Sequence, residues 1–297
     1  MSRKKCIVTP RNRNSSHPER VHSSMRVAMA LLTTCIAAAQ TPDAHAIVER
    51  SVAAGEENWK IARNYTFLER TEERHLDSSG QVKSKEVKTY DITLLEGSPY
   101  ERLVERDDHP LPPAEEKKEQ EKLQKSIAER MKESPAERER RIADYEKRRK
   151  REQGTMHEVA DAFDFKIAGQ ERIEGRDVWV IDATPRRDYR PRSRDAKILP
   201  HVQGRLWIDQ KTYNWVKLDA EVIDTVTWGL FLIRLDKGAH VAIDETRVNN
   251  EVWLPRRISI TASARLGIFK QLRVQQETTY RSFRKFQSDS HLMAVQQ

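Results

Sequence analysis

Cysteine is almost absent from this 297-residue chain, which has only Cys6 and Cys35. Both lie in the first 46 residues, a segment that we interpret as a removable leader. A chain without that leader has no thiol, so it can form neither a disulfide nor a cysteine-ligated metal site. Glycine is also scarce, with ten residues, and no Gly-rich low-complexity linker divides the chain.

Apolar runs are short. The run at residues 27–39 follows Arg26 and has 13 residues, whereas a membrane-spanning helix needs about 20. Its length is typical of the apolar part of a secretory signal peptide, and Ala44-His45-Ala46 supplies a cleavage site of the A-x-A type. The sequence therefore predicts a signal peptide over residues 1–46 and a mature protein in the periplasm or cell envelope.

Four alternatives for the leader stay open. The chain can start at Met25, because the basic stretch ahead of the apolar run is long for a signal peptide. Cleavage after Ala39 is a weaker option than cleavage after Ala46. The apolar segment can also stay attached as a hydrophobic helix. The last alternative is lipidation at Cys35, although Thr34 departs from the small residue that normally precedes a lipidated cysteine.

Positive charge is concentrated in the leader. The whole chain has 54 basic and 46 acidic residues, a formal net charge of +8. Residues 1–46 hold seven of the basic residues and two of the acidic ones, which leaves +3 for the remainder. A basic balance would favour a nucleic-acid partner. Since most of the excess is in a removable segment, we predict no nucleic-acid partner.

Beyond the leader the pattern of apolar residues alternates between helix and strand. Residues 47–63 predict a short helix, or two that break near Gly55, and residues 65–106 predict three antiparallel strands joined by short turns. Residues 109–155 are highly charged and predict two helices, the second with a Ser134-Pro135-Ala136-Glu137 capping box. We interpret them as an inserted helical hairpin that Gly154 ends. Its apolar seam is thin, so we expect it to add little stability.

Strand patterns return from residue 163 and continue to residue 280. Residues 228–235 are apolar on both faces, which predicts one strand covered on both sides. The predicted fold is α+β, with an antiparallel sheet curved into a half-barrel, a short N-terminal helix packed on it and an inserted charged helical hairpin. The expected segments are 1–46 (signal peptide), 47–108 (helix and first strands), 109–155 (hairpin), 156–290 (remaining half-barrel) and 291–297 (tail).

The second half contains five motifs that occur in a fixed order: Phe163-x-Phe165-x-Ile167-x-Gly169, Gly175-Arg176-x-Val178-Trp179-Val180-Ile181-x-x-x-Pro185, Gly204-x-Leu206-Trp207-Ile208-Asp209-x-x-Thr212, Val252-Trp253-Leu254-Pro255 and Tyr280-x-x-Phe283-x-x-Phe286. Together they resemble the LolA/LolB-like family of outer-membrane lipoprotein-sorting proteins. The resemblance implies a half-barrel sheet closed by helices, whose concave apolar face takes up lipid acyl chains.

No motif indicates an enzyme or a cofactor. The chain has no G-x-S-x-G, P-loop, G-x-G-x-x-G after a strand, or H-E-x-x-H. The six histidines beyond the leader include no pair at helical spacing, and we interpret them as surface or turn residues. Carboxylates near strand ends, such as Asp209, are explained at least as well by turn chemistry as by acid–base catalysis. We predict no catalytic residue, no metal and no cofactor.

Two sets of residues are candidates for ligand binding. The first is the wall of the half-barrel cavity, for which we select Val216, Leu218, Val222, Phe231 and Ile233. The second is the basic loop at 185–200, whose arginines at the mouth of a half-barrel could steer anionic head groups: Arg186, Arg187, Arg190, Arg192 and Arg194. The alternative for that loop is an ordinary soluble connection.

The sequence leaves two main functional hypotheses. The first is an exported, non-catalytic carrier or sensor that binds a lipid or a lipoprotein acyl chain in the half-barrel. The second is an envelope protein-interaction module that works through the hairpin at 109–155. A hydrolase is a weaker third. Any contact with a membrane should be peripheral.

Overall fold

The computed structural model describes residues 43–228, 233–266 and 270–286, which belong to one compact unit. Its helical elements are α1 (Ala44–Ala62), α2 (Pro113–Lys132), α3 (Pro135–Ala162) and the 3₁₀ helix η1 (Asp195–His201). Its strands are β1 (Tyr65–Leu76), β2 (Val82–Leu95), β3 (Ser98–Arg106), β4 (His109–Pro110), β5 (Phe163–Ile173), β6 (Arg176–Pro185), β7 (Val202–Asp209), β8 (Trp215–Val222), β9 (Val226–Trp228), β10 (Ile233–Leu235), β11 (His240–Val248), β12 (Val252–Leu266) and β13 (Lys270–Lys285).

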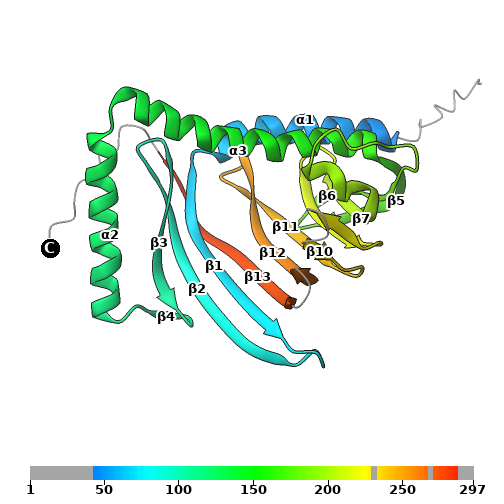
Figure 1. The fold of residues 1–297 in the computed structure, drawn as a ribbon. Coiled ribbons are helices and arrows are strands. Elements are labelled where there is room, and N and C mark those ends of the chain that lie inside the picture. Colours follow the sequence, from blue (N-terminus) through cyan, green and yellow to red (C-terminus); the bar gives the residue numbers. More distant parts are fainter. Residues whose placement is uncertain (1–42, 229–232, 267–269, 287–297) are drawn as a thin grey trace, which may run out of the picture. The chain divides into compact units, whose positions relative to one another are not determined.

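The strands form one antiparallel sheet in the order β4-β3-β2-β1-β13-β12-β11-β8-β7-β6-β5, with β9 and β10 attached to β12. The sheet curves without closing, and α1 and α3 run side by side along one end of its strands (Figure 1). The predicted α+β fold with an antiparallel half-barrel is therefore confirmed, and the architecture is that expected of a LolA-like protein.

Helix α1 is one continuous helix through Gly55 rather than two. Asp43 caps it by accepting a hydrogen bond from the His45 backbone at 3.0 Å, and Ala44, Ile47 and Val48 pack into the main hydrophobic cluster. The cleavage position expected after Ala46 thus lies in the first turn of this helix. Cleavage after Ala39 would leave the cap and the buried Ala44 in place.

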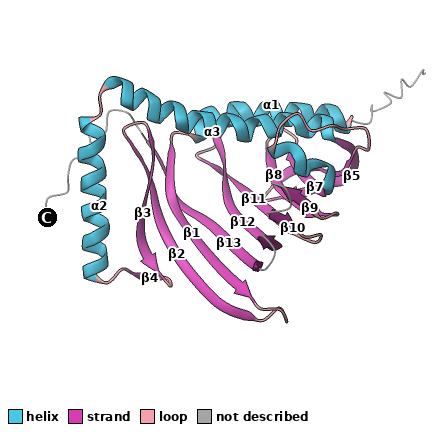
Figure 2. Cartoon of the chain, viewed as in Figure 1, coloured by secondary structure: helices cyan, strands magenta, loops and turns pink. Residues whose placement is uncertain are grey.

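The two charged helices lie where the sequence places them but do not form a side-by-side hairpin. Helix α2 packs on β3, while α3 turns away from it and lies against α1 (Figures 1 and 2). Gly154 does not end the second helix, which continues to Ala162 because Val159, Ala160 and Ala162 are buried. The gain from burying these side chains outweighs the cost of a mid-helix glycine, about 1 kcal/mol.

The elbow between α2 and α3 is fixed to the turn that joins β2 and β3. Arg130 donates hydrogen bonds to the backbone oxygens of Leu95 and Ser98, the latter at 3.1 Å. Ile142 packs against Gly97, where a Cβ atom would lie 2.9 Å from the Ile142 Cδ1 atom, and Gly97 has a φ of +84°. The insertion is therefore held more firmly than its few apolar residues predicted.

One predicted strand differs. The apolar segment at 228–235 contains the last residue of β9 and all of β10, and the backbones of these two strands pair with Ile233 opposite Trp228. Both strands are three residues long. The apolar pattern predicted a sheet element here but could not reveal that β9 and β10 run in opposite directions. In the described part of the segment Arg234 is exposed and Leu235 is half-buried, so coverage on both faces stays a prediction.

Candidate functional site

The face of the sheet that α1 and α3 cover at one end is called here the inner face. Its covered part is the main cluster, in which Leu206 and Ile208 of β7 pack with Trp179 and Ile181 of β6 under residues of both helices. Leu218 of β8 is half-buried against the same cluster. This end of the half-barrel is filled.

Away from the helices the inner face continues as rows of aliphatic side chains. Leu218 pairs with Ile243, which pairs with Ile258, and in the next row Val241 pairs with Ile260. Side chains directly opposite each other in an antiparallel sheet lie on the same face, so these residues form one surface. Further along β12 and β13 the surface continues with Leu235, Ala262, Ala264, Leu272 and Val274.

This surface is only partly covered. All nine residues of β11 are half-buried, and so are Ile258 and Ile260. Among the described residues α1 and α3 follow the strand ends rather than crossing the centres of β12, β13 and β1 (Figure 2). The inner face thus presents solvent-accessible aliphatic side chains on adjacent strands, a surface that a soluble protein keeps small unless it binds something.

Beside Ile258 the inner face becomes polar, at Thr278 and Tyr280 of β13 and on the adjacent strand β1. Thr278 and Thr71 face each other with their hydroxyl oxygens 3.2 Å apart. Tyr280 pairs with Glu69, and burial together with the Glu69 carboxylate raises the pKa of the Tyr280 hydroxyl. Burial and the nearby Glu101 raise the pKa of Glu69 in turn. An apolar ligand would therefore favour the β8–β12 side of the inner face.

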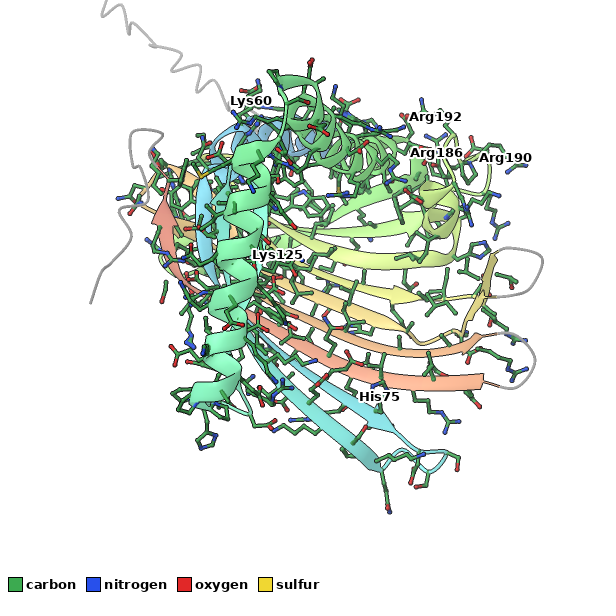
Figure 3. The ribbon with its side chains drawn as sticks, turned by 60° about the vertical axis from the view of Figure 1, so that its left-hand side comes forward. Lys60, His75, Lys125, Arg186, Arg190 and Arg192 are labelled. Atoms are coloured by element: carbon green, nitrogen blue, oxygen red, sulfur yellow. The ribbon has the colours of Figure 1, made fainter. Side chains whose placement is uncertain are left out.

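A groove of about 800 Å³ lies beside this surface, between the basic loop and the segment that joins β8 to β9. It is lined by Pro185, Arg186, Arg187, Tyr189, Arg190, Pro191, Lys197, Pro200, His201, Ile223, Asp224, Val226 and Thr227. Four of these side chains are cationic and one is a carboxylate. Figure 3 shows Arg186, Arg190 and Arg192 grouped at the side of the fold away from α2. The arrangement suits an anionic group.

The basic loop is held in place by a buried network. Tyr189 is buried in the main cluster and its hydroxyl donates a hydrogen bond to Glu158 of α3. The Arg192 backbone N–H also donates to the Glu158 carboxylate, at 2.8 Å. Burial raises the pKa of Glu158, but these hydrogen bonds outweigh it and leave the pKa below its ordinary value. The loop is therefore part of the packed structure.

The predicted arginines divide into two groups. Arg186, Arg187 and Arg190 line the groove. Arg192 instead pairs with Asp161 and lies 3.9 Å from Glu158, while Arg194 is exposed outside the groove lining. Lys197, which belongs to the same basic run in the sequence, also lines the groove, together with His201, which the sequence predicted to be a surface or turn residue. Five arginines within nine residues predicted a basic surface, but the sequence could not show which of these arginines line the groove.

The predicted wall residues are also dispersed. Leu218 lies on the inner face. Val222 is buried beside that face, in a cluster with Val226 and Ala239. Val216 is the extra residue of a β-bulge, since Trp207 pairs with Lys217 and Ile208 with Trp215; it packs on the opposite face with Trp207. Phe231 lies outside the described residues, and only the backbone pairing of Ile233 with Trp228 and Leu266 is described.

The aliphatic residues that sequence reasoning missed are Val241, Ile243, Ile258 and Ile260. Their alternation along β11 and β12 was visible in the sequence, and both strands were predicted. What the sequence could not provide was the register that places them beside Leu218.

Asp209 shows turn chemistry. Its buried carboxylate accepts hydrogen bonds from the backbone N–H groups of Lys211 and Thr212, at 3.0 and 2.7 Å, and lies 3.3 Å from Arg176 Nη1. No group of three or more histidine, cysteine or acidic residues that could hold a metal occurs in the described part of the chain. Nor does any helix among the described residues have the length and apolarity to cross a membrane.

No protein-family profile and no curated protein sequence matches the chain. Similar solved structures include a domain assigned to outer membrane lipoprotein sorting from Vibrio parahaemolyticus, 10% identical with a TM-score of 0.34, for which the alignment covers 82% of this chain and 95% of that one. A LolA superfamily protein from Nitrosomonas europaea is 10% identical with a TM-score of 0.31, covering 83% and 94%. The MucA/MucB complex of Pseudomonas aeruginosa is 12% identical with a TM-score of 0.20, covering 83% and 100%. At these scores the similarities carry no statement about function.

Proposed function

We propose that this protein is an exported, non-catalytic carrier that binds an apolar chain, of a lipid or a lipoprotein, on the inner face of its half-barrel. The observation that carries the proposal is the continuous, half-exposed aliphatic surface formed by Leu218, Ile243 and Ile258 with the neighbouring Val241 and Ile260. Covering it with an acyl chain would contribute about 25 cal/mol per Å² of apolar area removed from water, without any catalytic group.

The position of this surface supports the proposal further. It continues the packed cluster under α1 and α3 and ends at the polar side chains of β13. A bound chain would therefore have a closed end, formed by the cluster, and a polar border. Ligand sites are commonly mostly apolar with a few polar groups that fix orientation.

A charge on the inner face should weaken binding. Ile260→Glu places a carboxylate among the aliphatic rows, and we expect it to weaken binding of a fluorescent fatty acid at least tenfold, which corresponds to about 1.4 kcal/mol. Ile260 is half-buried, so the new carboxylate can keep part of its hydration and the fold should persist. The measurement is a fluorescence titration, with circular dichroism of each variant.

Thr261→Glu is the matched control, because Thr261 is the next residue on β12 and lies exposed on the opposite face. It introduces the same charge and should leave binding unchanged. An intact, folded protein that binds no apolar probe would refute the carrier proposal, as would equal losses in the two variants.

The helical insertion supports a second candidate, an interaction module in the cell envelope. Helix α2 has no buried residue, and the Met131 and Met156 side chains are 68% and 44% exposed. Exposed methionines are frequent on adaptable protein-binding surfaces. A protein that co-purifies with the wild type but not with a Met131→Asp variant, while fatty-acid binding is unchanged, would favour this candidate.

A further inference from the structure

We propose that the groove of about 800 Å³ beside the basic loop binds the phosphate group of an anionic lipid whose acyl part reaches the inner face. This inference rests on the carrier function proposed above and names the class of its ligand. The groove is of the size that holds small-molecule ligands, roughly 300–1,000 Å³.

The charges in the groove are unevenly neutralised. Arg186 is paired with Asp188, through hydrogen bonds of 3.1 and 2.9 Å. Arg190 donates hydrogen bonds to the backbone oxygens of Arg187 and Tyr189, so its side chain is oriented by uncharged groups. Within the described part of the chain no ion pair involves Arg187 or Lys197. Against these three cations the groove presents a single carboxylate, Asp224.

The cations are held on a fixed support. Tyr189, within the segment that carries the arginines, and Ala196 and Leu199, which follow it, are buried in the main cluster. The Ser193 hydroxyl accepts a hydrogen bond from the Ala196 backbone at 3.1 Å, and Glu158 holds both Tyr189 and the Arg192 backbone. A preorganised site loses less conformational entropy on binding than a mobile loop does.

The groove is continuous with the apolar surface. Val226 lines the groove and is also buried in the cluster with Val222 and Ala239. Leu235 and Ala262, which extend the aliphatic rows, pack against that same cluster. A ligand with its phosphate in the groove would therefore have apolar surface directly beside it.

These features together favour a phosphate esterified to an apolar chain. Arginine binds phosphate through paired hydrogen bonds, which suits Arg187 and Arg190. A free phosphate would use the cations but not Ile223, Val226 and the three prolines, which give the groove an apolar wall. A zwitterionic lipid would bring a cation of its own into a groove that already has excess positive charge.

The test compares three probes by titration calorimetry on the full mature chain: water-soluble dihexanoyl phosphatidylglycerol, dihexanoyl phosphatidylcholine and inorganic phosphate. We expect phosphatidylglycerol to bind at least tenfold more tightly than either of the others, and its affinity to fall as salt rises. The double variant Arg187→Gln/Lys197→Gln should remove this preference, while binding of an uncharged apolar probe, the methyl ester of the fluorescent fatty acid, should stay unchanged. Arg140→Gln, which removes an exposed charge on α3, is the matched control and should change nothing.

The outcomes separate the two proposals. Equal affinity for the two lipids in a protein that still binds fatty acid would overturn the phosphate site and leave the carrier proposal intact. Inorganic phosphate that binds as tightly as phosphatidylglycerol would make the groove a site for free phosphate and overturn the lipid assignment. Loss of all apolar binding would count against the carrier proposal itself.

Discussion

Asp209→Ala should destabilise the protein by about 3 kcal/mol, because it breaks a buried pair and leaves hydrogen-bond donors without an acceptor. The Asp209 side chain is 1% exposed and accepts hydrogen bonds from Lys211 and Thr212 while facing Arg176. Urea unfolding followed by tryptophan fluorescence measures the loss. Asp177→Ala, near the start of β6, removes an exposed carboxylate 3.9 Å from Arg172 and should cost less than about 0.5 kcal/mol. Similar losses in the two variants would contradict this account.

The effect should also depend on pH. Burial alone would raise the pKa of Asp209, but hydrogen bonds from Thr212, Arg176 and Lys211 outweigh it and lower the pKa below its usual value. A pKa that is lower in the folded state stabilises the fold above the unfolded value, near 4, and this contribution is lost as the pH falls through the folded pKa. The difference between wild type and Asp209→Asn should therefore be constant from pH 7 to about 5 and shrink below about 4. A difference that grows on acidification would refute the assignment.

Arg141→Ala should release the elbow of the helical insertion. Arg141 forms two hydrogen bonds of 2.7 Å with Glu133, and it also donates to the Ser98 hydroxyl and the Glu96 backbone oxygen. Its removal leaves the Glu133 carboxylate without its partner, and we expect the elbow to open more readily. Hydrogen exchange should become faster in α2 and in the β2–β3 turn while the β5–β8 region keeps its protection.

Arg140→Ala is the control for the elbow, since Arg140 is the neighbouring arginine and its side chain is exposed. It should leave the exchange pattern unchanged. Unaltered protection in Arg141→Ala would mean that the insertion is anchored mainly by Arg130 and by the contact of Ile142 with Gly97.

Much of the fold follows from local patterns. Alternating apolar residues predicted most strands, and the Ser134–Glu137 capping box correctly marked the start of α3. The ends of elements were harder, because they depend on distant packing. Helix α1 passes through Gly55, and α3 passes through Gly154 because the residues that follow it are buried against strands that come later in the chain.

The candidate site was less accessible to sequence reasoning. A β-bulge at Val216 moves that residue to the face opposite Leu218. The alternating pattern of apolar residues does not reveal such an inserted residue. Arg192 looks like its neighbours in the basic loop, yet it pairs with Asp161, 31 residues earlier. Which cations remain available to a ligand is set by tertiary partners rather than by the composition of the loop.

Helix α3 has a mechanical consequence for the opening of the half-barrel. Its first turns contact β3, near one edge of the sheet, and its last residue leads directly into β5, the other edge strand. Its 28 residues correspond to about 42 Å of unbroken helix. The helix is thus a rigid spacer between the two edges of the sheet. The length of the helix therefore sets the width of the half-barrel's opening and limits how far the curved sheet can flex.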